Sequence, residues 1–404
     1  MKKVIKCGKL FTATDERVQE NMAVVIEDNK IVEVAPAAAV DCAGCEVIDL
    51  SDKFVMPGLI DTHLHTAFDG RPGCMETQIT WTAGDFAFAS MKNAEKDLMA
   101  GFTTVRDEGS YGFVDVALRN AINRGDVVGP RMMVSGRPLG TTGGHSDSHY
   151  NPDIHGETTM GLISDGPDGA RHAARYTLKY GADQIKLMAT GGVMSIGDEP
   201  GAPDFTFEEM KAALDVANSR GHISSAHAHG AVGIKNAIRA GITSIEHGMM
   251  MDDECIDMMA EHGTYLVPTI VAAYKIVENG DSLPAEAVEK ATRCLVNHGK
   301  NLEKCRAKGV KIAFGTDAGT YYNYHGTQTC EFALMQKYGN FGVAESLLSA
   351  TKVASELMRM NDRVGSIEAG KLADITAFDV SPFDDIHTME NCTFVMKDGV
   401  VYKG

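Results

Sequence analysis

Short apolar runs separated by turns characterise both ends of the chain. Four such runs near the N-terminus predict β-strands, and they lie at residues 4–5, 22–26, 31–34 and 47–50. Residues 27–30, Glu-Asp-Asn-Lys, separate two of these runs and predict a hairpin turn. The C-terminal runs that repeat the pattern lie at residues 373–378, 393–396 and 400–402. Neither end alone has enough strands to bury a face, so we expect both to form one small β-sandwich; two separate flaps are the alternative.

Between residues 58 and 357, strand-like runs alternate with longer helical stretches. The eight strand candidates lie at residues 58–65, 103–106, 131–135, 184–188, 223–227, 244–247, 265–268 and 312–317. The helical stretch 208–217 is preceded by Thr206, which is suited to cap its first turn. Eight strands in about 260 residues predict an α/β fold, a (β/α)8 TIM barrel. We therefore expect a catalytic barrel at residues 58–357 and a β-sandwich domain built from residues 1–57 and 358–404.

Metal-binding or acid–base residues occupy five of these candidate strands. Two of them, His63 and His65, end the first strand, and alternate side chains of a strand point to the same face. The other four are one in each of the fourth, fifth, sixth and eighth strands: Lys186, His227, His247 and Asp317. The C-terminal strand ends of a (β/α)8 barrel form its active site, so we expect all six side chains to meet there. Several imidazoles and a carboxylate together suit a divalent metal such as zinc.

Composition narrows the class of protein and its partners. The chain has 404 residues and a formal net charge of −17, which disfavours binding to nucleic acid. No apolar run is long enough to span a membrane, and no apolar segment follows the basic N-terminus as in a signal peptide. The number of cysteines is nine, an odd number, which favours reduced thiols over a disulfide framework. We expect a cytoplasmic enzyme with a small-molecule substrate.

Five segments match motifs of a known superfamily. Three of them are residues 57–65 (Pro-Gly-Leu-Ile-Asp-Thr-His-Leu-His), 315–319 (Gly-Thr-Asp-Ala-Gly) and 365–374, and they resemble the amidohydrolase superfamily. The other two, residues 185–192 (Ile-Lys-Leu-Met-Ala-Thr-Gly-Gly) and 227–230 (His-Ala-His-Gly), are similar to its prolidase-like dipeptidases. Those relatives cleave Xaa-Pro bonds or bonds before Arg or Lys. The resemblance covers nearly the whole chain.

The resemblance implies a centre of two divalent metal ions, with zinc as the first expectation and Mn, Co or Fe suited to the same ligands. It implies that Lys186 is an N6-carboxylysine that bridges both ions. The residues that it assigns to the more buried ion are His63, His65 and Asp317, and those that it assigns to the other are His227 and His247. Asp317 would also take a proton from the attacking water and pass it to the leaving amine. A Lys186 cation buried without a partner would be unfavourable, which also favours carboxylation.

Two further histidines are candidates for substrate binding. The long loop 136–160 contains His145, which resembles the family's carboxylate-binding histidine; an ordinary exposed loop histidine is the alternative. His229 lies two residues beyond His227, and we expect it to contact substrate, although a metal-ligand role stays open.

Other residues near the strand ends have less specific interpretations. We expect Arg106 and Asp107 to form a structural salt bridge at the barrel rim. Glu246 is expected to point away from His247, to the other face of its strand, because side chains alternate along a strand. The three tyrosines that follow Asp317 either line the pocket or only pack: Tyr321, Tyr322 and Tyr324.

The functional hypothesis is a binuclear-metal amidohydrolase that cleaves a dipeptide or an N-acyl amino acid with a free α-carboxylate, of Xaa-Pro or Xaa-Arg/Lys type. The alternative is hydrolysis of a non-peptide amide, carbamate, urea or cyclic amide, as in imidazolonepropionase. A deaminase is disfavoured because Gly230 stands where such enzymes usually place a glutamate, and a metal-free scaffold is disfavoured because all six ligand positions are filled. The resemblance also implies a homo-oligomer.

Overall fold

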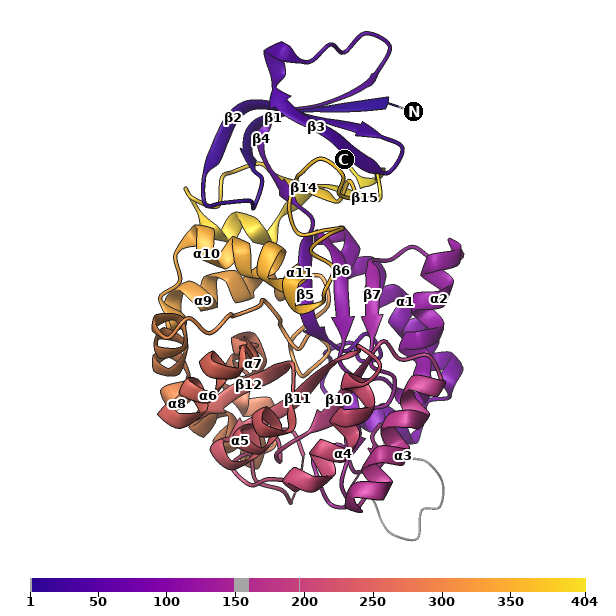
Figure 1. The fold of residues 1–404 in the computed structure, drawn as a ribbon, viewed down its shortest axis with the longest axis vertical. Coiled ribbons are helices and arrows are strands. Elements are labelled where there is room, and N and C mark those ends of the chain that lie inside the picture. Colours follow the sequence, from indigo (N-terminus) through magenta and orange to yellow (C-terminus); the bar gives the residue numbers. More distant parts are fainter. Residues whose placement is uncertain (1, 149–159, 196) are drawn as a thin grey trace.

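Both chain ends lie together at one end of the molecule, above a larger body of helices and parallel strands (Figure 1). The computed structural model describes residues 2–148, 160–195 and 197–404. Part of the predicted loop 136–160, residues 149–159, therefore lies outside the described residues. Among the described helices, none has the length and apolar character that crossing a membrane requires.

The chain ends pair in one seven-stranded sheet with the order β16-β15-β14-β4-β1-β2-β3. Its strands are β1 (Lys2–Phe11), β2 (Val18–Glu27), β3 (Lys30–Pro36), β4 (Glu46–Pro57), β14 (Ile375–Phe378), β15 (Cys392–Lys397) and β16 (Val400–Lys403). The two ends join where β14 pairs antiparallel with β4. One hydrophobic cluster contains residues from both ends, among them Ile5, Val24, Ile375 and Phe394. The alternative of two separate flaps is wrong. These seven strands form a single sheet, so a two-sheet sandwich is not confirmed. The predicted turn does connect β2 to β3.

The larger body contains two sheets whose strands are all parallel. One has the order β5-β6-β7 and the other the order β13-β12-β11-β10-β8-β9. Their bounds are β5 (Leu59–Leu64), β6 (Phe102–Asp107), β7 (Arg131–Val134), β8 (Leu139–Gly140), β9 (Leu162–Ile163), β10 (Gln184–Met188), β11 (Ile223–Gly230), β12 (Ser244–Met250) and β13 (Tyr265–Val267). The fold is therefore α/β. Because the described parallel strands form two sheets, one closed barrel is not confirmed.

The eighth predicted strand, residues 312–317, is wrong as a strand, although all its residues are described. The segment makes isolated parallel bridges, Leu266 to Ile312 and Leu64 to Ala318, and its backbone turns at Asp317, where φ is 60°. It still connects the two sheets at this side, since Thr62 N donates to Phe314 O (3.0 Å). At the other side, Asp183 N donates to Val134 O (2.8 Å) and links the start of β10 to β7.

Helices follow most of these strands and surround them (Figure 1). They are α1 (Ala83–Met99), α2 (Val114–Arg124), α3 (Gly166–Lys179), α4 (Phe207–Asn218), α5 (Ala231–Ala240), α6 (Asp253–His262), α7 (Ile270–Glu278), α8 (Ala285–Ala307), α9 (Glu331–Gly339), α10 (Val343–Leu348) and α11 (Ala354–Leu357). The predicted cap of α4 is confirmed, because Thr206 Oγ1 accepts from Glu209 N and Glu209 accepts from Thr206 N.

Candidate metal centre

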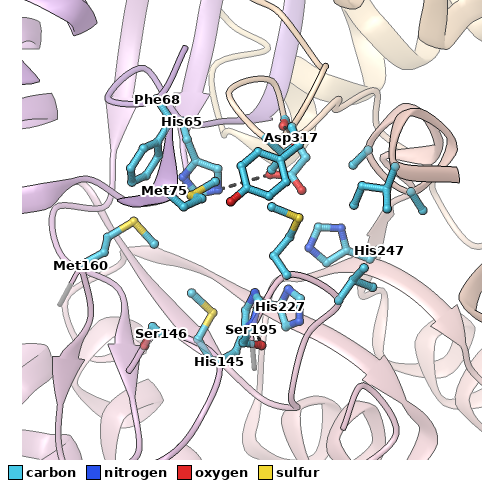
Figure 2. Close-up of a pocket in the computed structure, with 18 of the residues that line it drawn as sticks. His65, Phe68, Met75, His145, Ser146, Met160, Ser195, His227, His247 and Asp317 are labelled. Carbon is cyan, nitrogen blue, oxygen red and sulfur yellow. Dashed lines mark hydrogen bonds and ion pairs between the residues drawn. The ribbon is translucent and has the colours of Figure 1, made fainter. Parts of the chain in front are cut away.

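A cavity of about 290 Å³ opens at the C-terminal ends of the parallel strands. It is lined by all six predicted ligands and both predicted substrate-binding histidines: His63, His65, His145, Lys186, His227, His229, His247 and Asp317. In Figure 2 the side chains of His65, His145, His227, His247 and Asp317 surround a common space. The structure therefore brings together residues that are up to 254 positions apart, as His63 and Asp317 are.

His63 and His65 extend from the end of β5 toward Asp317. Their Nε2 atoms lie 3.5 Å and 3.3 Å, respectively, from Asp317 Oδ1. His65 Nδ1 donates to Gly109 O (2.9 Å), and His63 Nδ1 lies 2.7 Å from Glu246 Oε2. A carbonyl oxygen or a carboxylate oxygen only accepts, so each Nδ1 carries the proton and each Nε2 is free to bind a metal.

His227 and His247 reach the cavity from the neighbouring strands β11 and β12. Their ring centroids are 4.7 Å apart, and the centroid of His247 lies 5.0 Å from that of His63. His247 Nδ1 lies 2.6 Å from Thr269 Oγ1, which leaves its Nε2 available. The four imidazoles thus form a connected group with Asp317.

Lys186 is buried in β10 but has a partner, contrary to the expectation above. Its Nζ lies 3.2 Å from Glu108 Oε2. Glu108 is itself buried and also accepts from Ser225 Oγ (2.5 Å) and Gln184 Nε2 (2.9 Å). The cost of an unpaired charge therefore does not argue for carboxylation of Lys186. Carboxylation stays compatible with this contact, because a carbamate keeps one N–H that can donate to Glu108.

Two predictions from the sequence are wrong: the partner and position of Arg106, and the direction in which Glu246 points. Arg106 is fully buried and pairs with Glu108 (2.8 Å) and Glu246 (2.9 Å), rather than with Asp107 at the rim. Glu246 faces the interior beside His63 and contacts Arg106, although His247 next to it also faces the cavity. The reason is that His247 has φ 69°, so the alternation of side chains along β12 breaks there.

Burial and Asp317 together set the protonation of the histidine cluster. Burial opposes the charged form of His65, but contacts with Asp317 outweigh it and raise the pKa of His65. Burial and then the charge of Lys186 lower the pKa of His63 well below its usual value. Burial lowers the pKa of His227 and of His247 in the same direction, with further contributions from neighbouring histidines. Burial also opposes the charged form of Asp317, but contacts with His65 and His63 outweigh it and lower the pKa of Asp317. Neutral imidazoles beside an ionised carboxylate are the forms that bind metal ions.

Two groups of three described residues place their ligand atoms within 4.8 Å of one another. They are His63, His247 and Asp317, and His63, Glu108 and Glu246. The first group fits a divalent cation because its imidazoles are neutral and its carboxylate is ionised. In the second group both glutamates pair with Arg106, and Glu108 also pairs with Lys186, so we interpret them as support for His63 and Lys186.

His145 belongs to a chain of polar contacts that the sequence did not reveal. Its Nδ1 lies 2.7 Å from Ser195 Oγ, and Ser195 Oγ lies 2.7 Å from Asp198 Oδ1. Lys290, buried on α8, donates to Ser195 O (3.0 Å) and to Asp198 Oδ1 (3.4 Å). Because the Ser195 hydroxyl donates to Asp198, His145 Nδ1 donates to Ser195 Oγ, and the Nε2 of the neutral His145 ring is an acceptor. The ring of His145 stacks on that of His227, with centroids 4.1 Å apart.

Of the remaining predicted residues, His229 and one tyrosine line the cavity, and two tyrosines do not. His229 Nδ1 is buried and has no hydrogen-bond partner among the described residues, which is unfavourable unless a ligand supplies one. Tyr321 lines the cavity, and its hydroxyl donates to Glu76 (3.1 Å). Tyr322 instead contacts Ser282 through its hydroxyl (2.6 Å), and Tyr324 is 36% exposed. Only the first of the three tyrosines faces the cavity.

Residues 54–404 match the Amidohydrolase family, so the chain belongs to that family. Its relatives support a hydrolase of C–N bonds and, within the family, a prolidase-like type.

Three proteins illustrate what this chain is similar to in sequence and structure. A crystal structure of a Xaa-Pro dipeptidase with bound methionine in the active site is 37% identical, with a TM-score of 0.93 and all of both chains covered. The structure of a prolidase complexed with N-methylphosphonate-L-proline is 32% identical, with a TM-score of 0.91 and the same coverage. Ochratoxinase from Aspergillus niger is 31% identical, with 99% of this chain and 86% of the relative covered.

Proposed function

We propose that this protein is a binuclear-metal amidohydrolase that cleaves the amide bond of a dipeptide or N-acyl amino acid with a free α-carboxylate. The observation that carries the proposal is the convergence of four imidazoles, Lys186 and the ionised Asp317 in one cavity. The prolidase-like relatives support the substrate class. This substrate class includes dipeptides of Xaa-Pro and Xaa-Arg/Lys type.

Each of the six predicted metal ligands has a proposed role. His63, His65 and Asp317 would hold one divalent cation, His227 and His247 would hold the second, and Lys186, as N6-carboxylysine, would be a ligand of both. Such cations, zinc in the first instance, would supply an acidified water and a polarised scissile carbonyl. Asp317 would accept the proton that this water loses and donate it to the leaving amine.

His145 and His229 are proposed to bind the substrate carboxylate. Both are neutral near pH 7, because burial lowers the pKa of His145 to about 4 and that of His229 to about 3. His229 would therefore bind it as an N–H donor through its unpartnered Nδ1. His145, whose Nδ1 donates to Ser195 Oγ, would take up a proton from solvent at Nε2 as the carboxylate binds.

A substrate screen with metal-replete enzyme tests the proposal. Xaa-Pro, Xaa-Arg, Xaa-Lys and N-acyl amino acids are each compared with the matching amide in which the carboxylate is replaced by a carboxamide. We expect hydrolysis of the acids and a fall in kcat/KM of at least roughly tenfold for the carboxamides, since His145 and His229 would lose their anionic partner. Cleavage only of compounds without a carboxylate, such as carbamates, ureas or cyclic amides, would favour the alternative function on the same residues.

We also propose the finer architecture expected from the sequence. Residues 58–357 form one (β/α)8 barrel that residues 312–318 close between β5 and β13, and residues 1–57 with 358–404 form a separate β-sandwich domain. Assembly into a homo-oligomer and a location in the cytoplasm stay predictions, for light scattering and cell fractionation, respectively, to test.

A further inference from the structure

The cavity has an apolar wall that the proposed chemistry does not use. Five methionines line it together with the histidine cluster: Met75, Met160, Met188, Met194 and Met249. Phe68 lies on the same wall, and Figure 2 shows it next to Met75. These residues come from segments that are far apart in the sequence, so the wall exists only in the folded protein.

The wall is continuous because Met194 joins two hydrophobic clusters. One cluster contains Phe68 and Tyr321, with Met75 and Met160 packed against it, and Met194 contacts it. The other is built on Met249 and Ile276, and Met194 packs against that cluster too. Met194 is itself only partly buried, so its side chain can contact both the clusters and a ligand.

The acidic side chains of the cavity each contact a protein group. Among the described lining residues the acids are Glu76, Asp147 and Asp317. Glu76 accepts from Tyr321, Asp147 accepts from Gly143 N (2.9 Å), and Asp317 contacts the two histidines of β5. These acids are few, and the larger part of the cavity surface, to which the methionine side chains contribute, is apolar.

We propose that the substrate carries a large neutral apolar group, aromatic or long aliphatic, that packs against this methionine wall. This inference rests on the proposed function and narrows it, because it selects an apolar substrate over one with a lysine or arginine side chain. Methionine is unbranched and polarisable, so it adapts to groups of different shape and makes favourable contacts with aromatic rings. Burial of a side chain of this size favours binding enough to raise kcat/KM by roughly 10- to 100-fold.

A substrate series measures this preference directly. The amino-acid half and the acyl half are varied in turn through Gly, Ala, Pro, Leu, Met, Phe, Lys and Arg, with acetyl, hexanoyl and benzoyl as further acyl groups. We expect the large apolar groups to exceed Gly, acetyl and the cationic groups by roughly 10- to 100-fold in kcat/KM in at least one half. Equal rates across both series, or a preference for Lys or Arg, would overturn the inference. Hydrolysis of none of these compounds would instead refute the proposed function.

Variants at Met194 assign the preference to the wall. Met194→Glu should lower kcat/KM for the best apolar substrate at least roughly tenfold and improve the ratio of Lys to Phe substrates, because it places a carboxylate on the apolar surface. Met194→Leu should keep the preference. Met91→Glu adds the same charge at an exposed methionine of α1 and should change nothing. If Met194→Glu keeps its metal content and also the wild-type preference, the wall does not select the substrate.

Discussion

His63 Nδ1 lies 2.7 Å from Glu246 Oε2, and both side chains are almost completely buried. The other carboxylate oxygen of Glu246 accepts from Arg106 (2.9 Å). A proposed metal ligand is therefore oriented by a carboxylate that is itself fixed by an arginine. Such contacts hold a ligand histidine in one tautomer and increase its basicity.

Replacement of Glu246 by Gln should weaken metal binding by roughly 10- to 100-fold. The variant keeps the size of the side chain but removes the charge that orients His63 and pairs with Arg106. Metal titration of the chelator-treated protein, followed by assay of activity against metal concentration, measures the effect. Glu345→Gln, which removes a surface carboxylate paired with Arg306, is the matched control. Wild-type metal affinity in Glu246→Gln would show that the contact has no role at the centre.

Variants at Lys186 test whether this residue is a bridging carboxylysine or a structural cation. Lys186→Arg keeps a positive charge near Glu108 but cannot be carboxylated, whereas Lys186→Ala removes both functions. We expect both variants to bind fewer metal ions per chain and to lose at least roughly 100-fold in kcat, because the proposed second ion lacks its bridging ligand. Intact mass spectrometry under native conditions should detect one added CO2 in the wild type alone. Two ions and normal turnover in Lys186→Arg would exclude the carboxylysine.

Ser195 should matter for substrates that carry a carboxylate. Its hydroxyl lies between His145 Nδ1 and Asp198, so Ser195→Ala leaves the ring of His145 without the group that sets its tautomer. We expect KM to rise roughly tenfold for acidic substrates while the KM for their carboxamides stays the same, since one hydrogen bond contributes about 1 kcal/mol. Ser195→Thr, which retains the hydroxyl, should restore most of the loss. An equal rise for both substrate types would instead indicate a general disturbance of the loop.

The proposed ligands were predictable because strand periodicity and chain position both constrain them. His63 and His65 share a face of β5, and the C-terminal strand ends of a parallel α/β fold converge. Arg106 and Glu108 carry a similar signal that was missed: they are two residues apart at the end of β6, and both face the interior.

The rest of the site depends on contacts that leave no local pattern. Glu246 faces His63 because the backbone of His247 has a positive φ, which alternation along a strand cannot predict. Ser195 and Asp198 lie in an irregular segment, and Lys290 reaches them from a helix about 90 residues later. The methionine wall likewise depends on tertiary packing between distant segments.

Glu331 should be a major determinant of stability near the site. It is fully buried, and its two oxygens accept from Ile270 N (2.9 Å) and Val271 N (2.7 Å) at the start of α7. Glu331→Ala leaves two buried N–H groups without an acceptor, so we expect the free energy of unfolding to fall by about 2–5 kcal/mol. Glu331→Gln keeps one acceptor and should lose less. Urea unfolding measures both, with the surface variant Glu289→Ala as the control; a loss under about 1 kcal/mol in Glu331→Ala would contradict the assignment.

Asp115 should make stability depend on pH. Burial, and then the charge of Asp107, raise its pKa from 3.8 to about 8 in the folded protein. The folded state therefore binds more protons than the unfolded state between these values, and stability falls as pH rises. The contribution is fully present below about pH 4 and is lost as pH rises through about 8. Asp115→Asn cannot titrate, so its free energy of unfolding should fall less steeply than that of the wild type between pH 5 and 8, whatever its absolute stability. Parallel slopes for the two proteins in urea unfolding would show that Asp115 has an ordinary pKa.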